Sequence, residues 1–399
     1  MSQTIPDSPN TAPLNVEAAV RARYGAAAEA AEPQLCCAVD YNAEYLKIIP
    51  QEIIDRDYGC GDPSRHVQTG ETVLDLGSGG GKICYIASQV VGPTGRVIGV
   101  DCNDTMLDLA RRHRKPIGDT LGYHNVEFRK GRIQDLQLNL DLLDDHLKSH
   151  QVNSSSDWLE AQEQAQHLRE TAPLIDDDSI DVVVSNCVLN LVRNEDRRQL
   201  FAEIHRVLRR GGRAVISDIV SDETVPEHLK QDPELWSGCL SGAFREDEFL
   251  EAFEQAGFYG IEIIERQQAP WRVIEGIEFR SLTVRAFQGK AGPCLDRQQA
   301  VIYNGPWKMV VDDDGNTLHR GKRMAVCDKT FHIYNQSPYA DQCTAIEPQV
   351  EIPLDEATAF DCCQNELRAP SDTKNAPDNS LGSLPQLQDG DCCGPTGCC

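Results

Sequence analysis

Glycines at alternate positions give the clearest sign of chemistry in this sequence. Gly77, Gly79 and Gly81 follow Asp75 in the run VLDLGSGGG, after an apolar segment and before a helical pattern. Glycines at such a place let the backbone approach a ligand closely beside a helix N-terminus. Asp101 ends the next apolar segment about twenty residues later, where a carboxylate can accept both hydroxyls of a ribose. The pattern predicts a nucleoside-containing cofactor, with a nicotinamide dinucleotide as one alternative.

Cysteines are the second candidate for chemistry, and the chain has 16 of them. A chain of this size needs no disulfide scaffold, and the paired C-x2-C spacing of a zinc site is absent. Two interpretations stay open, namely incidental core thiols and soft-ion chemistry. Adjacent cysteines rarely bridge to each other. The adjacent pairs are Cys36-Cys37, Cys362-Cys363, Cys392-Cys393 and Cys398-Cys399.

Alternating strands and helices must position these residues. Short apolar runs separated by helical patterns indicate a parallel sheet covered on both faces. The expected fold class is α/β, a doubly wound and mostly parallel sheet whose last two strands form an antiparallel edge. The expected strands are 72–77, 96–101, 126–131, 180–186, 213–220, 260–265 and 280–287. The expected helices are 15–31, 44–57, 82–91, 105–114, 195–209 and 249–258.

Shifts in composition divide the rest of the chain. Residues 136–178 are acidic and rich in Ser and Gln, which predicts a surface insertion with one weak helix near 157–169. A hairpin turn is expected at Asp314-Gly315. The expected parts are a disordered lead at 1–13, an N-terminal helical segment at 14–70, a cofactor-binding domain at 71–220, a lid with the final strands at 221–290, a small β-rich unit at 291–348 and a disordered, cysteine-containing tail at 349–399.

Composition excludes several classes of partner. The 399 residues include 63 acidic and 38 basic side chains, and the resulting net charge of −25 repels nucleic acid and anionic membranes. No stretch reaches the roughly 18 apolar residues that a membrane span needs. The first residues, MSQTIPDSPNTAPLN, lack the pattern of a secretion signal. We therefore expect a cytoplasmic protein.

The glycine-rich run and Asp101 make the sequence resemble the class I S-adenosylmethionine-dependent methyltransferases. In that family the loop holds the methionine half of the cofactor, the acid after the second strand holds the ribose, and the loop after the third strand meets the adenine. For Asn186, capping of a turn is an alternative to cofactor contact. The resemblance implies a cofactor site made of Asp75, Gly77, Ser78, Gly79, Gly81, Asp101, Cys102, Met106, Gly131, Arg132, Ile133 and Asn186.

Two cysteine motifs narrow the resemblance to the arsenite methyltransferase branch. They are SNCVLNL, which contains Cys187, and LWSGCLSGAF, which contains Cys239. Cys60 in YGCG and the Cys36-Cys37 pair accompany them. The resemblance implies that Cys187 and Cys239 hold trivalent arsenic as thiolates and that Cys60 can supply a third sulfur. It also implies a disulfide between Cys60 and Cys36 or Cys37 during turnover, which thioredoxin or glutathione would reduce.

The implied reaction agrees with the chemistry of arsenic. Trivalent arsenic is soft and thiophilic, so thiolates rather than carboxylates should bind it. Its lone pair can attack the cofactor methyl directly if the reacting atoms lie about 3–3.5 Å apart. No general base is then needed, which agrees with ten histidines that show no ligand spacing. The resemblance implies an enzyme that methylates arsenite or its thiol conjugates in arsenic detoxification.

Two other functions stay open from the sequence. A methyltransferase of the same fold would act on a small organic acceptor such as a quinone or a sterol. A thiol-rich metalloid-binding protein would keep the fold without turnover, although the glycine loop argues against it. The terminal pairs at 392–393 and 398–399 would either pass arsenite to the active site or have no part in catalysis. Cys294, Cys327 and Cys343 lie in no motif and are expected to be structural.

Overall fold

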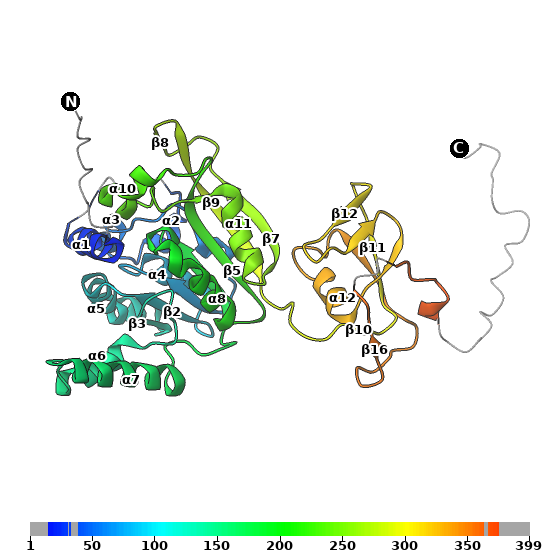
Figure 1. Ribbon diagram of the computed structural model, residues 1–399, viewed down its shortest axis with the longest axis horizontal. Helices are drawn as coiled ribbons and strands as arrows, with labels where there is room; N and C mark the ends of the chain where they lie inside the picture. The colour runs from blue at the N-terminus through cyan, green and yellow to red at the C-terminus, as the bar shows by residue number, and fades with distance from the viewer. Residues whose placement is uncertain (1–14, 31, 33–38, 363–365, 375–399) are drawn as a thin grey trace, which may run out of the picture. The chain divides into compact units, whose positions relative to one another are not determined.

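The computed structural model describes residues 15–30, 32, 39–362 and 366–374, and the chain divides into two compact units, Met1–Gly289 and Lys290–Cys399 (Figure 1). The expected disordered lead at 1–13 and the end of the expected tail therefore lie outside the described residues. Among the described residues, no helix has the length and apolar character that crossing a bilayer requires.

A twisted sheet forms the centre of the first unit. Its strand order is β3-β2-β1-β4-β5-β9-β7, with β9 and β7 antiparallel and the others parallel. The expected α/β class with an antiparallel edge is confirmed. The strands are β1 (Thr72–Leu76), β2 (Arg96–Asp101), β3 (Val126–Lys130), β4 (Ile180–Asn186), β5 (Leu208–Ser221), β6 (Phe244–Arg245), β7 (Tyr259–Arg266), β8 (Arg272–Ile274) and β9 (Ile277–Phe287).

Alternating apolar side chains explain why helices cover both faces of this sheet. Leu74 and Leu76 point into one core with side chains of α8 (Arg197–Val207) and α11 (Glu246–Gln255). Val73, just before Leu74, points into a second core with side chains of α4 (Lys82–Val91) and α5 (Asp104–Leu121). Successive residues of a strand face opposite sides, so a run that is apolar at every position needs a layer of helices on each side.

Short elements connect or precede the sheet. The expected helix at 44–57 is two helices, because Pro50 starts a new one where the chain is extended. The remaining elements of this unit are α1 (Val16–Glu29), α2 (Ala43–Leu46), α3 (Gln51–Asp55), α9 (Glu227–Lys230) and α10 (Pro233–Ser237), with the 3-10 turns η2 (Pro63–His66), η3 (Leu189–Leu191) and η4 (Asn194–Asp196).

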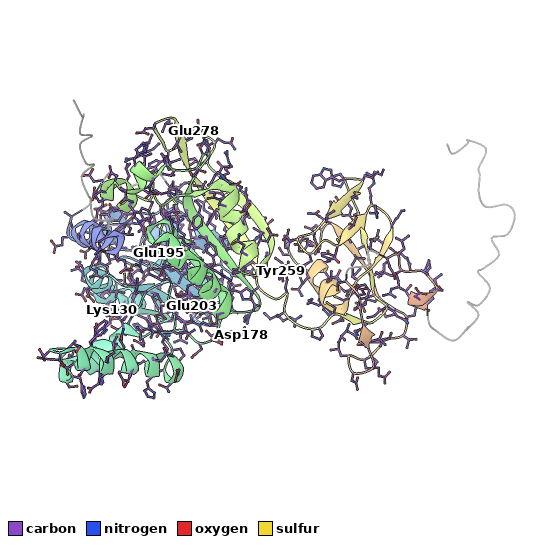
Figure 2. The ribbon with its side chains drawn as sticks, viewed as in Figure 1. Lys130, Asp178, Glu195, Glu203, Tyr259 and Glu278 are labelled. Carbon is purple, nitrogen blue, oxygen red and sulfur yellow. The ribbon has the colours of Figure 1, made fainter. Side chains whose placement is uncertain are left out.

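The acidic insertion forms two helices, α6 (Leu140–Ser149) and α7 (Ser155–Thr171), where only the second was expected. Lys130 lies at the end of β3 (Figure 2). It pairs with Asp144 of α6 at 2.7 Å and with Asp104 at 2.9 Å. The buried carboxylate of Glu203 on α8 accepts a hydrogen bond from the backbone N–H of Leu136 at 2.8 Å. The insertion is therefore fastened to the domain at both of these points.

The second unit is small and mostly β. Its main sheet has the order β14-β11-β15, and α12 packs Phe331 and Tyr334 against Val301 of that sheet. The expected hairpin at Asp314-Gly315 is present as the antiparallel pair β12 and β13. The elements are β10 (Leu295–Asp296), β11 (Ala300–Tyr303), β12 (Met309–Val311), β13 (Thr317–His319), β14 (Arg323–Ala325), α12 (Asp328–Tyr334), β15 (Cys343–Ile346), β16 (Thr358–Ala359) and η5 (Asp372–Lys374).

The beginning of the expected disordered tail is instead part of this unit. Strand β16 pairs with β10, and the Arg368 guanidinium binds the Asp296 carboxylate at 2.6 Å. The segment is polar because single hydrogen bonds and ion pairs, rather than a run of apolar side chains, hold it in place. Composition alone predicted that the disordered tail starts at 349. That start is too early, because the described residues up to 374 are part of the folded unit.

Candidate active site

A cavity of about 470 Å³ opens at the carboxyl ends of β1, β2 and β4. In an open α/β sheet ligands bind at this edge, because the loops after the parallel strands diverge there. All but one of the residues expected to bind the cofactor line the cavity, and the exception is Gly81. Helix α1 contributes Glu17, Arg21 and Tyr24 to the same lining.

The glycine loop has the geometry that its sequence predicts. Gly77 has a φ of 70°, and a β-carbon there would lie 2.4 Å from a methyl of Val188. Gly81 has a φ of 88° at the N-cap of α4, and a β-carbon there would lie 2.7 Å from the Phe128 ring. Gly81 therefore shapes the turn without lining the cavity. The hydroxyl of Ser78 is buried in this loop and has no hydrogen-bond partner among the described residues.

Two buried carboxyl groups face the same cavity. Asp101 accepts hydrogen bonds from the backbone N–H groups of Gly79 at 2.9 Å and Asn103 at 2.8 Å. Burial raises its pKa, and these hydrogen bonds oppose the shift. Burial also raises the pKa of Asp75 to about 7, while the Cys84 thiol, which donates to it at 3.2 Å, acts in the opposite direction.

These features fit a nucleoside cofactor of the S-adenosylmethionine kind. The unpartnered Ser78 hydroxyl offers a free donor and acceptor, and the left-handed glycine backbone leaves the loop open at Gly79, where no atom lies within 4 Å of a β-carbon position. Asp101 lines the cavity at the end of β2, the position at which the sequence predicts contact with the ribose hydroxyls. The Arg132 guanidinium, expected beside the adenine, forms an ion pair with Glu17 of α1 at the rim.

Three of the expected cysteines meet beside this cavity. The sulfur atoms of Cys60 and Cys187 and a carboxylate oxygen of Asp218 lie within 4.8 Å of one another. Cys239 belongs to the same buried cluster, and its thiol donates to the backbone carbonyl of Cys187 at 3.2 Å. Cys187 also lines the cofactor cavity. The other expected thiols, Cys36 and Cys37, lie outside the described residues.

The thiols of Cys60 and Cys187 hold their protons near neutral pH. Hydrogen bonding to the thiols of Cys239 and Cys60, together with burial, raises the pKa of the Cys187 thiol well above its ordinary value. Burial raises the pKa of the Cys60 thiol as well. These two thiols therefore meet a guest as protonated sulfur ligands, which suits a thiophilic guest that can accept their protons better than a bare metal cation.

Asn186 holds the loop of Cys60 against the strand of Cys187. Its Oδ1 accepts hydrogen bonds from the backbone N–H groups of Cys60 at 2.8 Å and Gly61 at 3.0 Å. Its Nδ2 donates to the Gly61 carbonyl at 2.8 Å. A β-carbon at Gly59 would lie 2.0 Å from the Asn186 amide. Asn186 lines the cavity as expected, but its amide hydrogen bonds serve the thiol cluster and cap no turn.

Asp218 and Asn190 position the other two cysteine segments; turn capping and cofactor or acceptor contact were the alternatives for Asn190, and sequence reasoning missed the part of Asp218. Asp218 accepts hydrogen bonds from the backbone N–H groups of Leu189 at 2.8 Å and Asn190 at 3.3 Å. The Asn190 side chain donates to Asp218 at 2.8 Å and to the Cys239 carbonyl at 3.4 Å. The available signal was an acid inside the apolar run AVISDIV.

The backbones of Cys187 and Cys239 are both strained. The φ angles of Cys187 and Cys239 are 63° and 61°, in the left-handed region that favours glycine. The network around Asp218 restrains both segments, because Asp218 accepts from the Leu189 N–H and Asn190 donates to the Cys239 carbonyl. Strain held in this way at a cluster of reactive side chains is a common property of functional sites.

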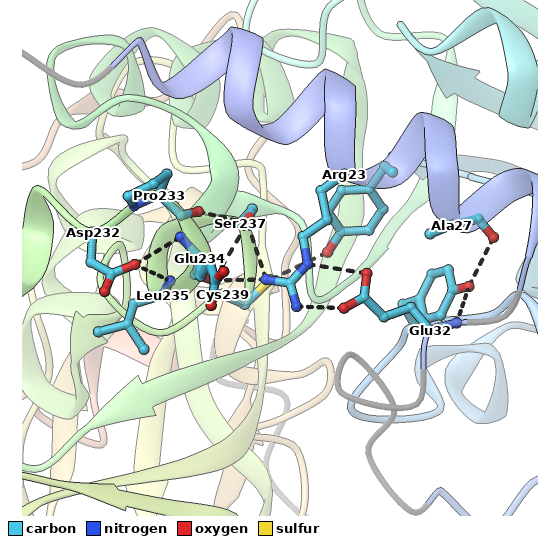
Figure 3. Close-up of polar contacts among 11 residues, drawn as sticks. Arg23, Ala27, Glu32, Asp232, Pro233, Glu234, Leu235, Ser237 and Cys239 are labelled. Atoms are coloured by element: carbon cyan, nitrogen blue, oxygen red, sulfur yellow. Dashed lines mark hydrogen bonds and ion pairs between the residues drawn. The ribbon is translucent and has the colours of Figure 1, made fainter.

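Side-chain hydrogen bonds join helix α1 to the cysteine segments (Figure 3). The Arg23 guanidinium donates to the Glu234 carbonyl at 2.7 Å and to the Ser237 hydroxyl at 3.1 Å, just before Cys239. The Tyr58 hydroxyl, two residues before Cys60, donates to the Ala27 carbonyl of α1 at 2.9 Å. One helix therefore contacts the segments that carry two of the three sulfurs.

The fold and the site define a class I S-adenosylmethionine-dependent methyltransferase. A family described as a methyltransferase domain matches residues 68–170 and 157–257. The chain is 31% identical to the arsenite methyltransferase of Aquipseudomonas alcaligenes over 321 residues, which cover 76% of this chain and 82% of that protein. It is 30% identical to the arsenite methyltransferase of Homo sapiens over 310 residues, which cover 74% of this chain and 72% of that protein.

A solved structure agrees with these relatives. The arsenic(III) S-adenosylmethionine methyltransferase of Chlamydomonas reinhardtii superimposes with a TM-score of 0.52 at 26% identity, covering 83% of this chain and all (100%) of that one. The chain belongs to the arsenite methyltransferase family. Residues 290–378 match a domain of unknown function, DUF8838.

Proposed function

We propose that this protein transfers a methyl group from S-adenosylmethionine to trivalent arsenic held by the sulfurs of Cys60, Cys187 and Cys239. The observation that carries the proposal is the position of Cys187, which belongs both to the buried thiol cluster and to the lining of the cofactor cavity. Family membership supports the same substrate. The physiological role would be arsenic detoxification.

Binding of arsenic needs no base at this site. Arsenous acid and three thiols form three arsenic–sulfur bonds and three water molecules, because each hydroxyl leaves with a thiol proton. Thiols with raised pKa values are therefore competent partners, and the buried pocket favours the neutral product. Asp218, whose pKa burial raises to about 6, holds the backbone of the Cys187 loop rather than acting on the guest.

Methyl transfer then depends on orientation. When bound, S-adenosylmethionine supplies an electrophilic methyl group on a cationic sulfur. Three sulfur ligands on one side would leave the arsenic lone pair on the other, and transfer requires that this second side face the cofactor cavity, which Cys187 lines. The lone pair forms the arsenic–carbon bond while the electrons of the breaking carbon–sulfur bond stay on the departing sulfur.

Arsenic has then given up two electrons and must regain them for another cycle. Two cysteine thiols supply them by forming a disulfide, and Cys60 with Cys36 or Cys37 is the pair that the family resemblance implies. Thioredoxin or glutathione would reduce this disulfide by thiol exchange.

A turnover assay tests the proposal. Wild type, Cys187→Ser and the control Cys343→Ser are incubated with arsenite, S-adenosylmethionine and a thiol reductant, and the arsenic species are separated by mass spectrometry. Cys343 is partly exposed and lies in the second unit. Methylated arsenic from wild type and Cys343→Ser but not from Cys187→Ser supports the proposal. Equal methylation by all three, or none with cofactor binding confirmed, overturns it, the second outcome in favour of an organic acceptor.

A further inference from the structure

A second group of cysteines converges in the C-terminal unit. The sulfur atoms of Cys294, Cys327 and Cys362 lie within 4.8 Å of one another, and all three thiols are free. Sequence reasoning left Cys294 and Cys327 as structural residues because no motif surrounds them. The reaction proposed above uses none of the three, and the family that matches this unit has no known function.

Three separate parts of the unit bring these sulfurs together. Cys294 and Cys362 flank the short strands β10 and β16, which pair Leu295 with Ala359. The backbone N–H of Phe360 donates to the Cys294 carbonyl at 2.9 Å, which fixes the two ends side by side. Cys327 comes from the N-cap of α12 and is fully buried. The cluster is therefore held by strand pairing on one side and by the packed helix on the other.

The exposure of the cluster is graded. Cys327 is buried at its base, whereas Cys294 and Cys362 are partly exposed. Cys294 and Cys362 are therefore the members of the cluster that a small solute would meet first. This arrangement differs from that of an incidental core thiol, whose sulfur is enclosed on all sides.

The electrostatic surroundings favour reaction at one of the sulfurs. Burial raises the pKa of the Cys294 thiol, but hydrogen bonding from Cys362 and the nearby Lys329 ammonium outweigh it, and the net shift is downward. Lys329 is held beside this loop, since its ammonium donates to the Gly292 carbonyl at 3.4 Å. Burial and hydrogen bonding to Cys294 raise the pKa of Cys362. One sulfur is thus the more readily ionised nucleophile, and its neighbour keeps a proton to give to a leaving hydroxyl.

The number and type of ligands in this cluster indicate which species it would bind. In the described part of the chain, the group consists of three cysteines and contains no histidine or carboxylate. Structural zinc takes four ligands in a tetrahedron. Trivalent arsenic needs only three sulfur ligands, because its lone pair takes the remaining position. It is as thiophilic as the soft metals that cysteine ligands prefer. We propose that Cys294, Cys327 and Cys362 form a second binding site for trivalent arsenic, separate from the methylation site.

The binding reaction balances without a co-reactant. Arsenous acid and three thiols give three arsenic–sulfur bonds and three waters. Where Cys294 reacts as the thiolate, one hydroxide replaces one of the waters. No electron is transferred, so the site needs no reductant beyond the conditions that keep its thiols free.

The test measures binding rather than turnover, so it is independent of the methylation reaction. The full-length chain carrying Cys60→Ser, Cys187→Ser and Cys239→Ser serves as background, because this removes the sulfurs of the first site. Arsenite is the probe, and bound arsenic is counted by equilibrium dialysis and elemental mass spectrometry. Sulfur neighbours are counted by X-ray absorption at the arsenic edge.

Cys327→Ser is the most informative added substitution. Cys327 caps α12 by accepting a hydrogen bond from the Thr330 N–H at 3.5 Å, and serine is a good N-cap, so the helix is retained. The expected result is loss of about one equivalent of tightly bound arsenic in Cys327→Ser, Cys294→Ser and Cys362→Ser, with affinity at least about tenfold weaker, or about 1.4 kcal/mol. Cys343→Ser is the matched control and keeps that equivalent.

Two results would overturn the proposal. Arsenic binding that is unchanged in all three cluster variants would show that the sulfurs do not act together. Purified chain that retains zinc through the same cysteines, and does not exchange it for arsenite, would assign the cluster to a metal ion. Circular dichroism of each variant separates a lost site from a lost fold.

Discussion

The Asn186 side chain accepts a hydrogen bond from the backbone N–H of Cys60 at 2.8 Å, although 126 positions separate the two residues. Asn186 also immediately precedes Cys187. A single amide thus sets the distance between two of the three sulfurs that we assign to arsenic. It is a positioning residue, since none of its bonds goes to a sulfur.

Removal of this amide should loosen the thiol cluster. In Asn186→Ala the backbone N–H groups of Cys60 and Gly61 lose their acceptor, and each lost hydrogen bond costs about 1 kcal/mol. We expect arsenite affinity to fall at least about tenfold while each remaining sulfur is still present. Isothermal titration with arsenite measures this. Asn139→Ala, which removes only the N-cap of α6, should leave the affinity unchanged, and equal affinities in both variants would contradict the prediction.

Gly77 and Gly122 separate the cost of a left-handed backbone from the cost of crowding. Their φ angles are 70° and 79°, but only at Gly77 does a β-carbon position meet another atom, at 2.4 Å from Val188. Gly122→Ala should lower the free energy of unfolding by about 1 kcal/mol, the cost of a left-handed alanine. Gly77→Ala should lose about 1–3 kcal/mol more from overpacking and should also weaken cofactor binding.

Urea denaturation gives both values. Val188→Ala removes the methyls that the new β-carbon would strike, so the double variant should recover part of the extra loss. If the two glycine variants lose the same stability, crowding at Gly77 is not the cause.

Arsenite binding to the first site should exchange almost no protons with the buffer. The thiols of Cys187 and Cys60 have raised pKa values and enter the reaction protonated, and their protons leave as water. Titration calorimetry is run in two buffers with different ionisation enthalpies, and the binding heat of Cys187→Ser is subtracted from that of wild type. The difference should therefore be the same in both buffers. Zinc is the control, because a metal ion must displace the thiol protons. Release of about two or three protons per arsenic would show that the resting thiols are ionised.

Asp75 should make the folded chain less stable as pH rises. Burial raises its pKa from 3.8 to about 7, so the folded state holds a proton that the unfolded state has released. Its contribution to the free energy of unfolding falls between about pH 4 and pH 7 and is constant above that range.

Asp75→Asn isolates this contribution, because asparagine keeps an oxygen for the Cys84 thiol and cannot ionise. The stability of the variant relative to wild type should increase from about pH 5 to about pH 8 in cofactor-free protein. Denaturant unfolding at several pH values measures it. A difference that does not change with pH would mean that Asp75 is already charged at pH 5.

The sheet and the glycine loop were predictable because their causes are local. Strand β4 is apolar at Val182, Val183 and Val184, and only a strand covered on both faces has that pattern. Gly77 must be glycine because of its own backbone angle. The segments that contain Cys187 and Cys239 were likewise identified from their own local sequence motifs.

The contacts between segments were not predictable, because they depend on packing over long sequence distances. Helix α1 is rich in alanine and only weakly amphipathic, so no pattern in it marks Arg23 as a partner of the segment before Cys239. Nothing in the spacing of Cys294, Cys327 and Cys362 indicates that they meet, since strand pairing and a helix cap bring them together. Asp218 is an acid in an apolar strand, a signal that is visible only once its partners are known.

The left-handed backbones of Cys187 and Cys239 have a consequence for the free energy of the folded chain. At φ angles of 63° and 61°, glycine would hold the same conformation at a cost lower by about 1 kcal/mol for each position. Substitution by glycine would relieve that backbone cost and remove a buried thiol in the same step. The backbone and the side chain at these two positions therefore have opposing requirements, and the sulfurs are kept at the expense of the backbone.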